Sequence, residues 1–244
     1  MRLAGAFLLV LAGCTGGDGG PQTESRTNAT VYYFDGDALT PVDRELRPGE
    51  GLEGVAQSML APAPGRLSSA LSEVEISEVS VVGDVITVEV DEGFVDASDD
   101  EVARRSGQVV YGLTASDLEA SVTFVSGAEP IEVITGDGSS TDDPVSRADY
   151  ARFRPWLEIL RPAPGDALAT HSFRVEVALR EEVDVRLKLE ASDRKYYDVV
   201  RSGVGIISVP LDVILVGGGT LTVTALQSGV ERSLEIPVTF NPQN

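Results

Sequence analysis

The chain has 244 residues, of which 39 are acidic and 19 are basic, so its formal net charge is −20. An excess of negative charge of this size makes nucleic acid and anionic lipid headgroups poor partners. One cysteine in the whole sequence excludes a disulfide within the chain. The length is sufficient for two domains.

The first 13 residues have the organisation of a secretory signal peptide. Arg2 supplies the positive end, and the uncharged run over residues 3–13 is too short for a bilayer core, which needs about 20 residues. Leu11-Ala12-Gly13-Cys14 then resembles the bacterial lipobox. The resemblance implies cleavage between Gly13 and Cys14 and a diacylglycerol on the Cys14 thiol. Such acyl chains would anchor the mature chain to the extracytoplasmic face of the cell membrane.

Residues 14–29 are rich in Gly, Thr, Ser and Gln, and predict a flexible tether between the anchor and the folded part. A coil of that length has an end-to-end distance of roughly 20 Å. We therefore expect a domain that begins near residue 30 and lies just clear of the lipid headgroups.

Residues 30–135 show alternating strand and helix patterns. Residues 30–34 and 39–46 predict two strands joined by an Asp35-Gly36-Asp37 turn, and Pro41 predicts that the second strand is an edge. A helical period follows, with a core-facing stripe formed by Leu52, Val55, Ala56, Met59 and Leu60.

Residues 79–90 predict a β-hairpin with a two-residue Gly83-Asp84 turn. That turn sets Val82 opposite Val85 and gives the hairpin one buried face. The expected members of this face are Val79, Val81, Ile86, Val88 and Val90.

The spacing of Ser98 and Glu101 is typical of a capping box, and it opens a second helix. Its apolar side carries Val102, Val109, Val110 and Leu113. Residues 121–125 and 131–134 predict two closing strands. The order of elements indicates helices on one face of a mixed or antiparallel sheet.

These segments together resemble the GerMN domain of bacterial sporulation and spore-germination lipoproteins. The resemblance runs over residues 31–154 and rests on VYYF, TPVDREL, VSVVGDVITVEVDEGF with its Asp91 and Phe94, QVVYGLT and VTFVSGAEPIEV. It implies a non-enzymatic module of envelope-associated assemblies.

Residues 136–155 are polar and predict a linker to a second domain over residues 156–241. Strict alternation of apolar and polar residues there predicts about seven strands of an Ig-like β-sandwich without a disulfide. This part weakly resembles the Ig-like domain that accompanies GerMN domains. The expected fold class is therefore α+β, with a GerMN-like sheet and two helices followed by an all-β sandwich.

No catalytic or metal-binding constellation stands out in the sequence. His171 is the only histidine, and the acidic clusters Asp35/Asp37 and Asp137/Asp142/Asp143 do not match a calcium-binding loop. We expect no catalytic residue, no metal and no cofactor, and leave open whether an acidic loop binds calcium.

The expected function is that of a membrane-anchored lipoprotein acting as a protein-binding or assembly module of the cell envelope. The resemblance links this role to sporulation or germination, and residues 30–46 are the expected docking edge. The alternative is a lipoprotein that binds cell-wall glycan through exposed aromatic rings. The candidates are Tyr32, Tyr33, Tyr196 and Tyr197, of which alternation predicts one buried ring in each pair.

Overall fold

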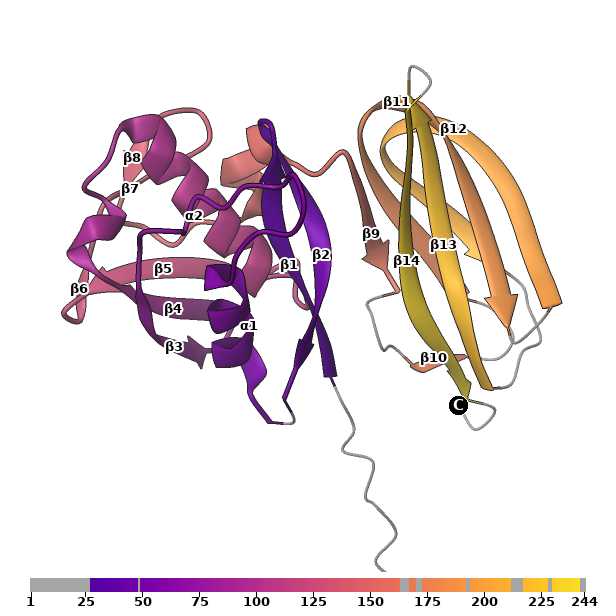
Figure 1. Ribbon diagram of the computed structural model, residues 1–244, viewed down its shortest axis with the longest axis horizontal. Helices are drawn as coiled ribbons and strands as arrows, with labels where there is room; N and C mark the ends of the chain where they lie inside the picture. The colour runs from indigo at the N-terminus through magenta and orange to yellow at the C-terminus, as the bar shows by residue number, and fades with distance from the viewer. Residues whose placement is uncertain are drawn as a thin grey trace, which may run out of the picture.

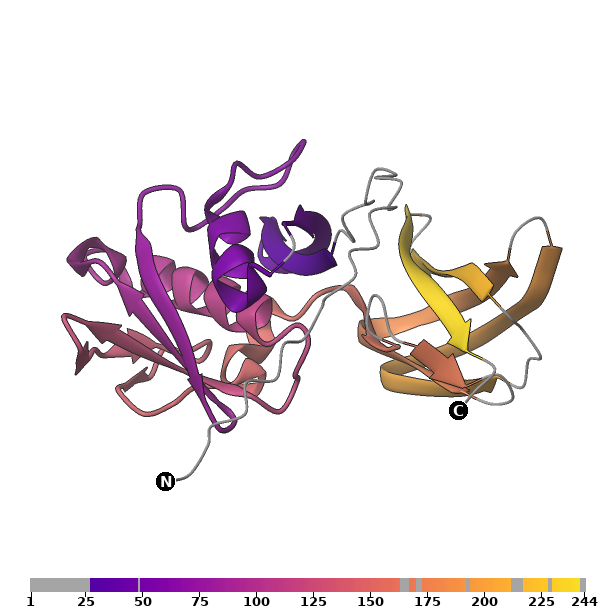
Figure 2. The same cartoon turned by 90° about the horizontal axis from the view of Figure 1, so that it is seen from below.

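The computed structural model describes residues 27–47, 49–162, 167–169, 173–191, 194–211, 217–227 and 230–241. The expected signal peptide, Gly13, Cys14 and His171 lie outside the described residues. Figures 1 and 2 show two bodies side by side, and each is built around its own apolar core. They are called the first and second domains below. No helix among the described residues is long and apolar enough to cross a bilayer.

The first domain contains a four-stranded mixed sheet with two helices packed against it (Figure 1). In the order β3-β4-β5-β6, the β4–β5 pair is parallel and the other two pairs are antiparallel. The α+β fold class is therefore confirmed. The elements are β3 (Ile76–Val82), β4 (Val85–Val90), β5 (Ser121–Ser126), β6 (Glu129–Pro130), α1 (Gly51–Leu60) and α2 (Asp99–Leu113).

The β3–β4 hairpin has the register predicted from its sequence. Val82 pairs with Val85, and Gly83 opens the turn with a φ of +64°. Glycine adopts this left-handed conformation without a steric penalty. Val81 differs from the prediction, because it is 52% exposed rather than buried. It lies on β3, the edge strand of the sheet, and so has a neighbouring strand on one side only.

The β1–β2 hairpin forms a separate two-stranded sheet that lies between the helices and the second domain (Figure 1). Its strands are β1 (Thr27–Asp35) and β2 (Ala38–Leu46). Tyr32 and Tyr33 are both buried, so the expectation of one exposed ring in this pair was wrong. The reason is that both faces of β1 are covered: Tyr33 points to α1 and Tyr32 points to the second domain.

Residues 136–155 pack into the first domain, contrary to the linker expected there. Tyr150 and Phe153 are buried in the first core, and Val145 exchanges two backbone hydrogen bonds with Val122. The burial of a few large apolar side chains thus holds the segment against the first domain despite its polar composition. The elements here are β7 (Val133–Ile134), β8 (Ser140–Thr141) and the 3-10 helix η2 (Arg147–Phe153), while a second 3-10 helix, η1 (Glu92–Phe94), precedes α2.

The second domain is a β-sandwich-like body in which β11 pairs with three other strands. About seven strands were expected in this domain, and the structure describes six, of which β11 and β12 are long. Between Leu179 and Val183 the register shifts, because Leu179 pairs with Gly205 and Val183 pairs with Gly203. Alternation is preserved across the shift, and odd-numbered side chains are buried along both halves of β11. The strands are β9 (Leu157–Arg161), β10 (Ala167–Ala169), β11 (Phe173–Ala191), β12 (Arg194–Leu211), β13 (Gly217–Gln227) and β14 (Val230–Asn241).

Candidate functional site

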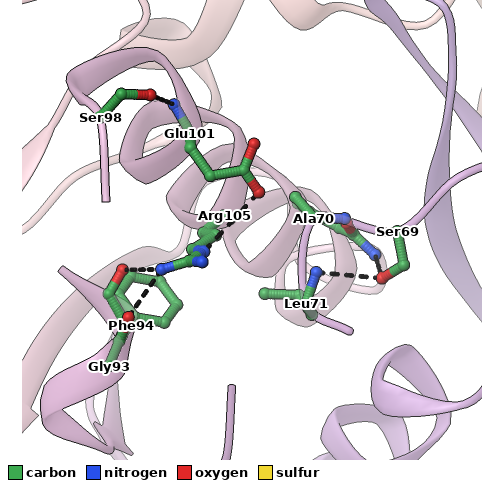
Figure 3. A network of polar contacts seen from close by, with 9 residues as sticks. Ser69, Ala70, Leu71, Gly93, Phe94, Ser98, Glu101 and Arg105 are labelled. Carbon is green, nitrogen blue, oxygen red and sulfur yellow. Dashed lines mark hydrogen bonds and ion pairs between the residues drawn. The ribbon is translucent and has the colours of Figure 1, made fainter. Parts of the chain in front are cut away.

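Buried polar side chains on α2 form one network, which Figure 3 shows. Arg105 donates through Nη1 to the carbonyl oxygens of Gly93 at 2.7 Å and Phe94 at 2.9 Å, and its Nε lies 3.7 Å from the carboxylate of Glu101. The backbone N–H of Glu101 donates to the Ser98 hydroxyl at 3.4 Å, as expected for the N-cap. The side chain of Glu101 thus binds Arg105 instead of completing the capping box.

Gln108 holds a second loop against α2. Its amide oxygen accepts the backbone N–H of Ala70 at 2.9 Å, and its amide nitrogen donates to the Ser69 hydroxyl at 3.1 Å. That hydroxyl also accepts the backbone N–H of Leu71 (Figure 3). Since these partners are mostly buried backbone groups, the α2 network fixes loops and offers no free acid, base or nucleophile.

The Asp-x-x-Phe segment has a structural role beside this network. Asp91 accepts the backbone N–H of Glu75 at 3.1 Å, and Phe94 is fully buried with its ring centroid 5.2 Å from that of Phe124. The segment therefore joins β4 to the core beneath α2.

A second polar network crosses the junction between the two domains. Glu158 of β9 accepts a hydrogen bond from the Tyr32 hydroxyl at 2.6 Å and forms an ion pair with Arg147 of η2. Arg147 also donates to the Tyr111 carbonyl oxygen and to the Thr114 hydroxyl, both at 2.8 Å. All these groups are buried or nearly so. The junction is thus fixed by directional contacts.

Burial decides the protonation states in this network. Burial first, and the Glu158 carboxylate second, raise the pKa of the Tyr32 phenol well above its ordinary value. Burial alone would lower the pKa of Arg147, but Tyr32 and Glu158 outweigh that effect and raise it. Tyr32 therefore stays a donor and Arg147 stays a cation. Both donors bind the same oxygen, Oε1 of Glu158.

A second ion pair joins the domains at the turn of the β1–β2 hairpin. The Asp35 carboxylate lies 3.1 Å from Arg232 of β14 and 3.0 Å from Arg66 of its own domain. Arg232 in turn lies over the ring of Trp156 at 4.9 Å. The arginine contacts to Asp35 argue against its use as a calcium ligand.

The junction leaves a cleft of about 380 Å³ between the β1–β2 hairpin, the loop after α2, β9 and β14. Leu118 and Leu160 line it, are half-buried, and belong to neither apolar core. Asp43 and Glu235 supply carboxylates among the lining residues. The other apolar lining residues are Pro41, Ala115, Ile159, Leu234 and Ile236.

Like Glu235, Asp43 is a carboxylate of this cleft without a basic partner among the described residues. It accepts the Thr30 hydroxyl at 3.2 Å, and no ion pair to it occurs in the described part of the chain. Burial raises the pKa of Asp43, and the Thr30 hydrogen bond partly offsets this. The carboxylate of Asp43, when ionised, could therefore pair with a cationic group of a partner.

Sequence reasoning found residues 30–46 but not the two residues that complete the junction. Arg147 and Glu158 are 115 and 126 positions from Tyr32, and no short motif contains them. The described residues contain no group of three or more His, Cys, Asp or Glu that could hold a metal. Asp137 accepts the Thr135 hydroxyl at 2.6 Å and the backbone N–H of Ser139 at 3.0 Å, which lower its pKa, so it serves a local turn.

No protein-family model matches the chain, and no curated protein matches its sequence. Solved structures do share features of its fold. One contains the tandem GerMN domains of the sporulation protein GerM from Bacillus subtilis, with 16% identity, coverage of 54% of this chain and 49% of that chain, and a TM-score of 0.39. A Clostridium perfringens protein described as a lipoprotein has 13% identity, coverage of 51% and 89%, and a TM-score of 0.35.

An endo-β-1,4-mannanase from Thermotoga petrophila is also similar, with 11% identity, coverage of 66% of this chain and 48% of that chain, and a TM-score of 0.31. The chain spans about half the length of the GerM and mannanase chains that it matches. At these identities the similarities concern the fold alone.

Proposed function

We propose that the chain is a lipid-anchored lipoprotein of the cell envelope, held at the extracytoplasmic face of the membrane through Cys14, which binds another envelope protein. The observation that carries the proposal is the interdomain cleft, to which Leu118 and Leu160 present apolar surface that neither core uses. Clefts at domain junctions with apolar walls and a few polar groups are preferred binding sites. The link to sporulation or germination rests on the GerMN-like sequence segments.

The partner surface that fits this cleft is aliphatic with a basic residue beside it. The apolar walls would bury the aliphatic part, and the unpaired carboxylate of Asp43 would face the basic group. An opposite charge also steers encounter and suppresses wrong partners. Residues 30–46, the expected docking edge, would then contribute one wall of the cleft rather than a free strand edge.

A non-enzymatic role is part of the proposal. Glu158, a buried carboxylate that lines the cleft, is engaged through Oε1 by both Tyr32 and Arg147. The glycan-binding alternative requires exposed aromatic rings. Tyr32 and Tyr33 are buried, and the side chains of Tyr196 and Tyr197 lie outside the described part of the structure. The wide groove of about 720 Å³ on the outer face of the second domain has no aromatic residue among its described lining residues. We therefore favour a protein partner.

The proposal is tested with the full anchored chain in native envelopes, using chemical crosslinking and affinity recovery. Leu118→Glu and Leu160→Glu should abolish recovery of the partner, because a charge in the apolar wall would be desolvated on binding. Val200→Glu is the matched control, since Val200 is exposed at 55% and lies away from the cleft. Recovery of the same proteins by all variants, with unchanged melting temperatures, would overturn the proposal.

A further inference from the structure

A second cleft, of about 290 Å³, lies at the turn end of the β1–β2 hairpin. It is lined by three arginines from three different elements: Arg104 of α2, Arg152 of η2 and Arg180 of β11. Asp37 and Asp100 also line it, so the cleft carries three positive and two negative charges. In a chain with a net charge of −20, this local excess of positive charge is an exception.

Two of the arginines lie over aromatic rings. The guanidinium of Arg104 lies 3.9 Å from the ring centroid of Phe34, and that of Arg152 lies 4.4 Å from the ring centroid of Phe153. A cation–π contact restrains a guanidinium, and Nη2 of Arg104 also donates to the Gly36 carbonyl oxygen at 3.0 Å. The site is therefore partly organised before any ligand arrives.

The aspartates that pair with these two arginines are exposed. Asp37 lies 3.3 Å from Arg104 with its side chain 93% exposed, and Asp100 lies 2.7 Å from Arg152 with its side chain 69% exposed. Exposed ion pairs of this kind contribute little to stability. Either carboxylate can turn to solvent when a stronger acceptor enters the cleft.

Arg180 is the unengaged member of the set. Its backbone N–H donates to the Trp156 carbonyl oxygen at 3.3 Å, but no carboxylate in the described part of the chain pairs with its side chain. The side chain is exposed and reaches the cleft from the second domain. A guanidinium carries five N–H donors in a fork that matches an oxyanion.

We infer that the cleft between Arg104, Arg152 and Arg180 binds a phosphate group. Guanidinium forks recognise phosphate oxygens by paired, charge-assisted hydrogen bonds, and three arginines from both domains line this cleft. The overall negative charge of the chain does not oppose this, because exposed charges beyond about 8–10 Å are largely screened at physiological ionic strength. The inference is independent of the protein-binding cleft, which is lined by other residues.

The first test is a calorimetric titration of the full chain with inorganic pyrophosphate at physiological ionic strength. Arg180→Ala should weaken binding about tenfold, in line with the loss of one charge-assisted contact, and Arg180→Lys should weaken it less. Arg174→Ala is the matched control: Arg174 is an exposed arginine on the same strand, bonded to Ser208 at 3.2 Å. It removes the same charge and should leave affinity within about twofold.

Asp37→Asn provides an independent readout with the opposite sign. Removing this competing carboxylate should tighten pyrophosphate binding several-fold, whereas a purely structural ion pair would give no change in affinity. The inference fails if the wild-type chain shows no binding at about 10 mM pyrophosphate, or if Arg174→Ala and Arg180→Ala weaken binding equally.

Sedimentation with vesicles distinguishes a phospholipid headgroup from a soluble phosphate compound as the ligand. The Cys14→Ser chain, which cannot be acylated at that thiol, is sedimented with vesicles of phosphatidylglycerol or of phosphatidylcholine. Binding to phosphatidylglycerol that is lost in Arg180→Ala assigns the site to a lipid headgroup. Pyrophosphate binding without vesicle binding assigns it to a soluble phosphate compound.

Discussion

The Tyr32 hydroxyl donates a hydrogen bond to the Glu158 carboxylate at 2.6 Å, joining β1 of the first domain to β9 of the second across 126 positions of sequence. Arg147 lies beside both groups and pairs with the same carboxylate. The Coulombic gain of a buried ion pair barely exceeds its desolvation penalty, so such pairs contribute little net stability. Their main effect here is to fix the orientation of the domains and thereby the shape of the cleft beside them.

Glu158→Gln should destabilise the chain strongly, because it leaves the buried cation of Arg147 without a carboxylate. Removing one member of a buried ion pair costs about 3–5 kcal/mol. The control is Asp198→Asn, whose partner Arg186 is 56% exposed, and for which less than about 1 kcal/mol is expected. Urea unfolding measures both values. Equal losses in the two variants would show that the junction does not depend on the buried pair.

Alkaline pH should weaken the fold through three buried phenols. Burial raises the pKa of Tyr32, Tyr111 and Tyr150 above that of an unfolded tyrosine, which is about 10. The folded state then holds these protons more tightly, so the unfolding free energy is constant below about pH 10 and falls as the pH rises toward the folded pKa values. Each phenol contributes a slope of about 1.4 kcal/mol per pH unit.

Urea unfolding at pH 9, 10 and 11 measures this slope, and absorbance of tyrosinate reports ionisation directly. Above pH 10, Tyr150→Phe should make the fall of the unfolding free energy with pH less steep by the contribution of one phenol. Below pH 10, the pH dependence of the unfolding free energy should not change. Ionisation of all six tyrosines near pH 10 in the folded chain would contradict the prediction.

Local patterns in the sequence predicted those elements whose structure depends on residues close to one another in the sequence. The apolar stripes of α1 and α2, the Ser98 cap and the β3–β4 register were all confirmed. These features depend on periodicity, on a cap and on a turn residue, each of which acts over a few positions.

Features that depend on distant packing were not predictable in this way. Residues 136–155 are polar in composition, yet Tyr150 and Phe153 are buried in the first core. There they cover apolar surface between α2 and β1. Tyr32 is buried for the same kind of reason, since β9 closes its exposed side. The junction is formed by residues far apart in sequence, and no spacing rule connects them.

Gly83→Val should destabilise the first domain through the backbone alone. Gly83 has a φ of +64°, and a Cβ built there meets no atom within 4 Å, so space does not limit the substitution. A left-handed conformation costs a residue with a Cβ about 1–2 kcal/mol. Gly83→Asn should cost less, because asparagine tolerates this conformation. Equal unfolding free energies for the two variants would count against this account.

Cys14→Ala tests the expected anchor. The lipobox resemblance predicts that this variant takes up no labelled lipid and leaves the membrane fraction, because the thiol is the acceptor of the diacylglycerol. Radiolabelled palmitate and fractionation at high salt measure the two effects. Val200→Glu should be labelled like the unmodified chain. Persistence of Cys14→Ala in the pellet at high salt would reject the anchor.

Gly112→Ala tests how closely α1 and α2 approach. A Cβ at this position of α2 would lie 2.0 Å from the Sδ of Met59 on α1. Met59 is fully buried, so its side chain can move only by changing its contacts in the core. Overpacking of this kind costs about 1–3 kcal/mol, which exceeds the gain of about 1 kcal/mol that alanine brings to a helix.

A double-mutant cycle separates the contact from general helix effects. Met59→Leu shortens the side chain that collides and should alone cost less than about 1.5 kcal/mol. In the double variant most of the cost of Gly112→Ala should disappear, which gives a coupling energy of about 1 kcal/mol or more. Urea unfolding of the four chains measures it. If the two single effects add within about 0.5 kcal/mol, the two helices do not meet at these residues.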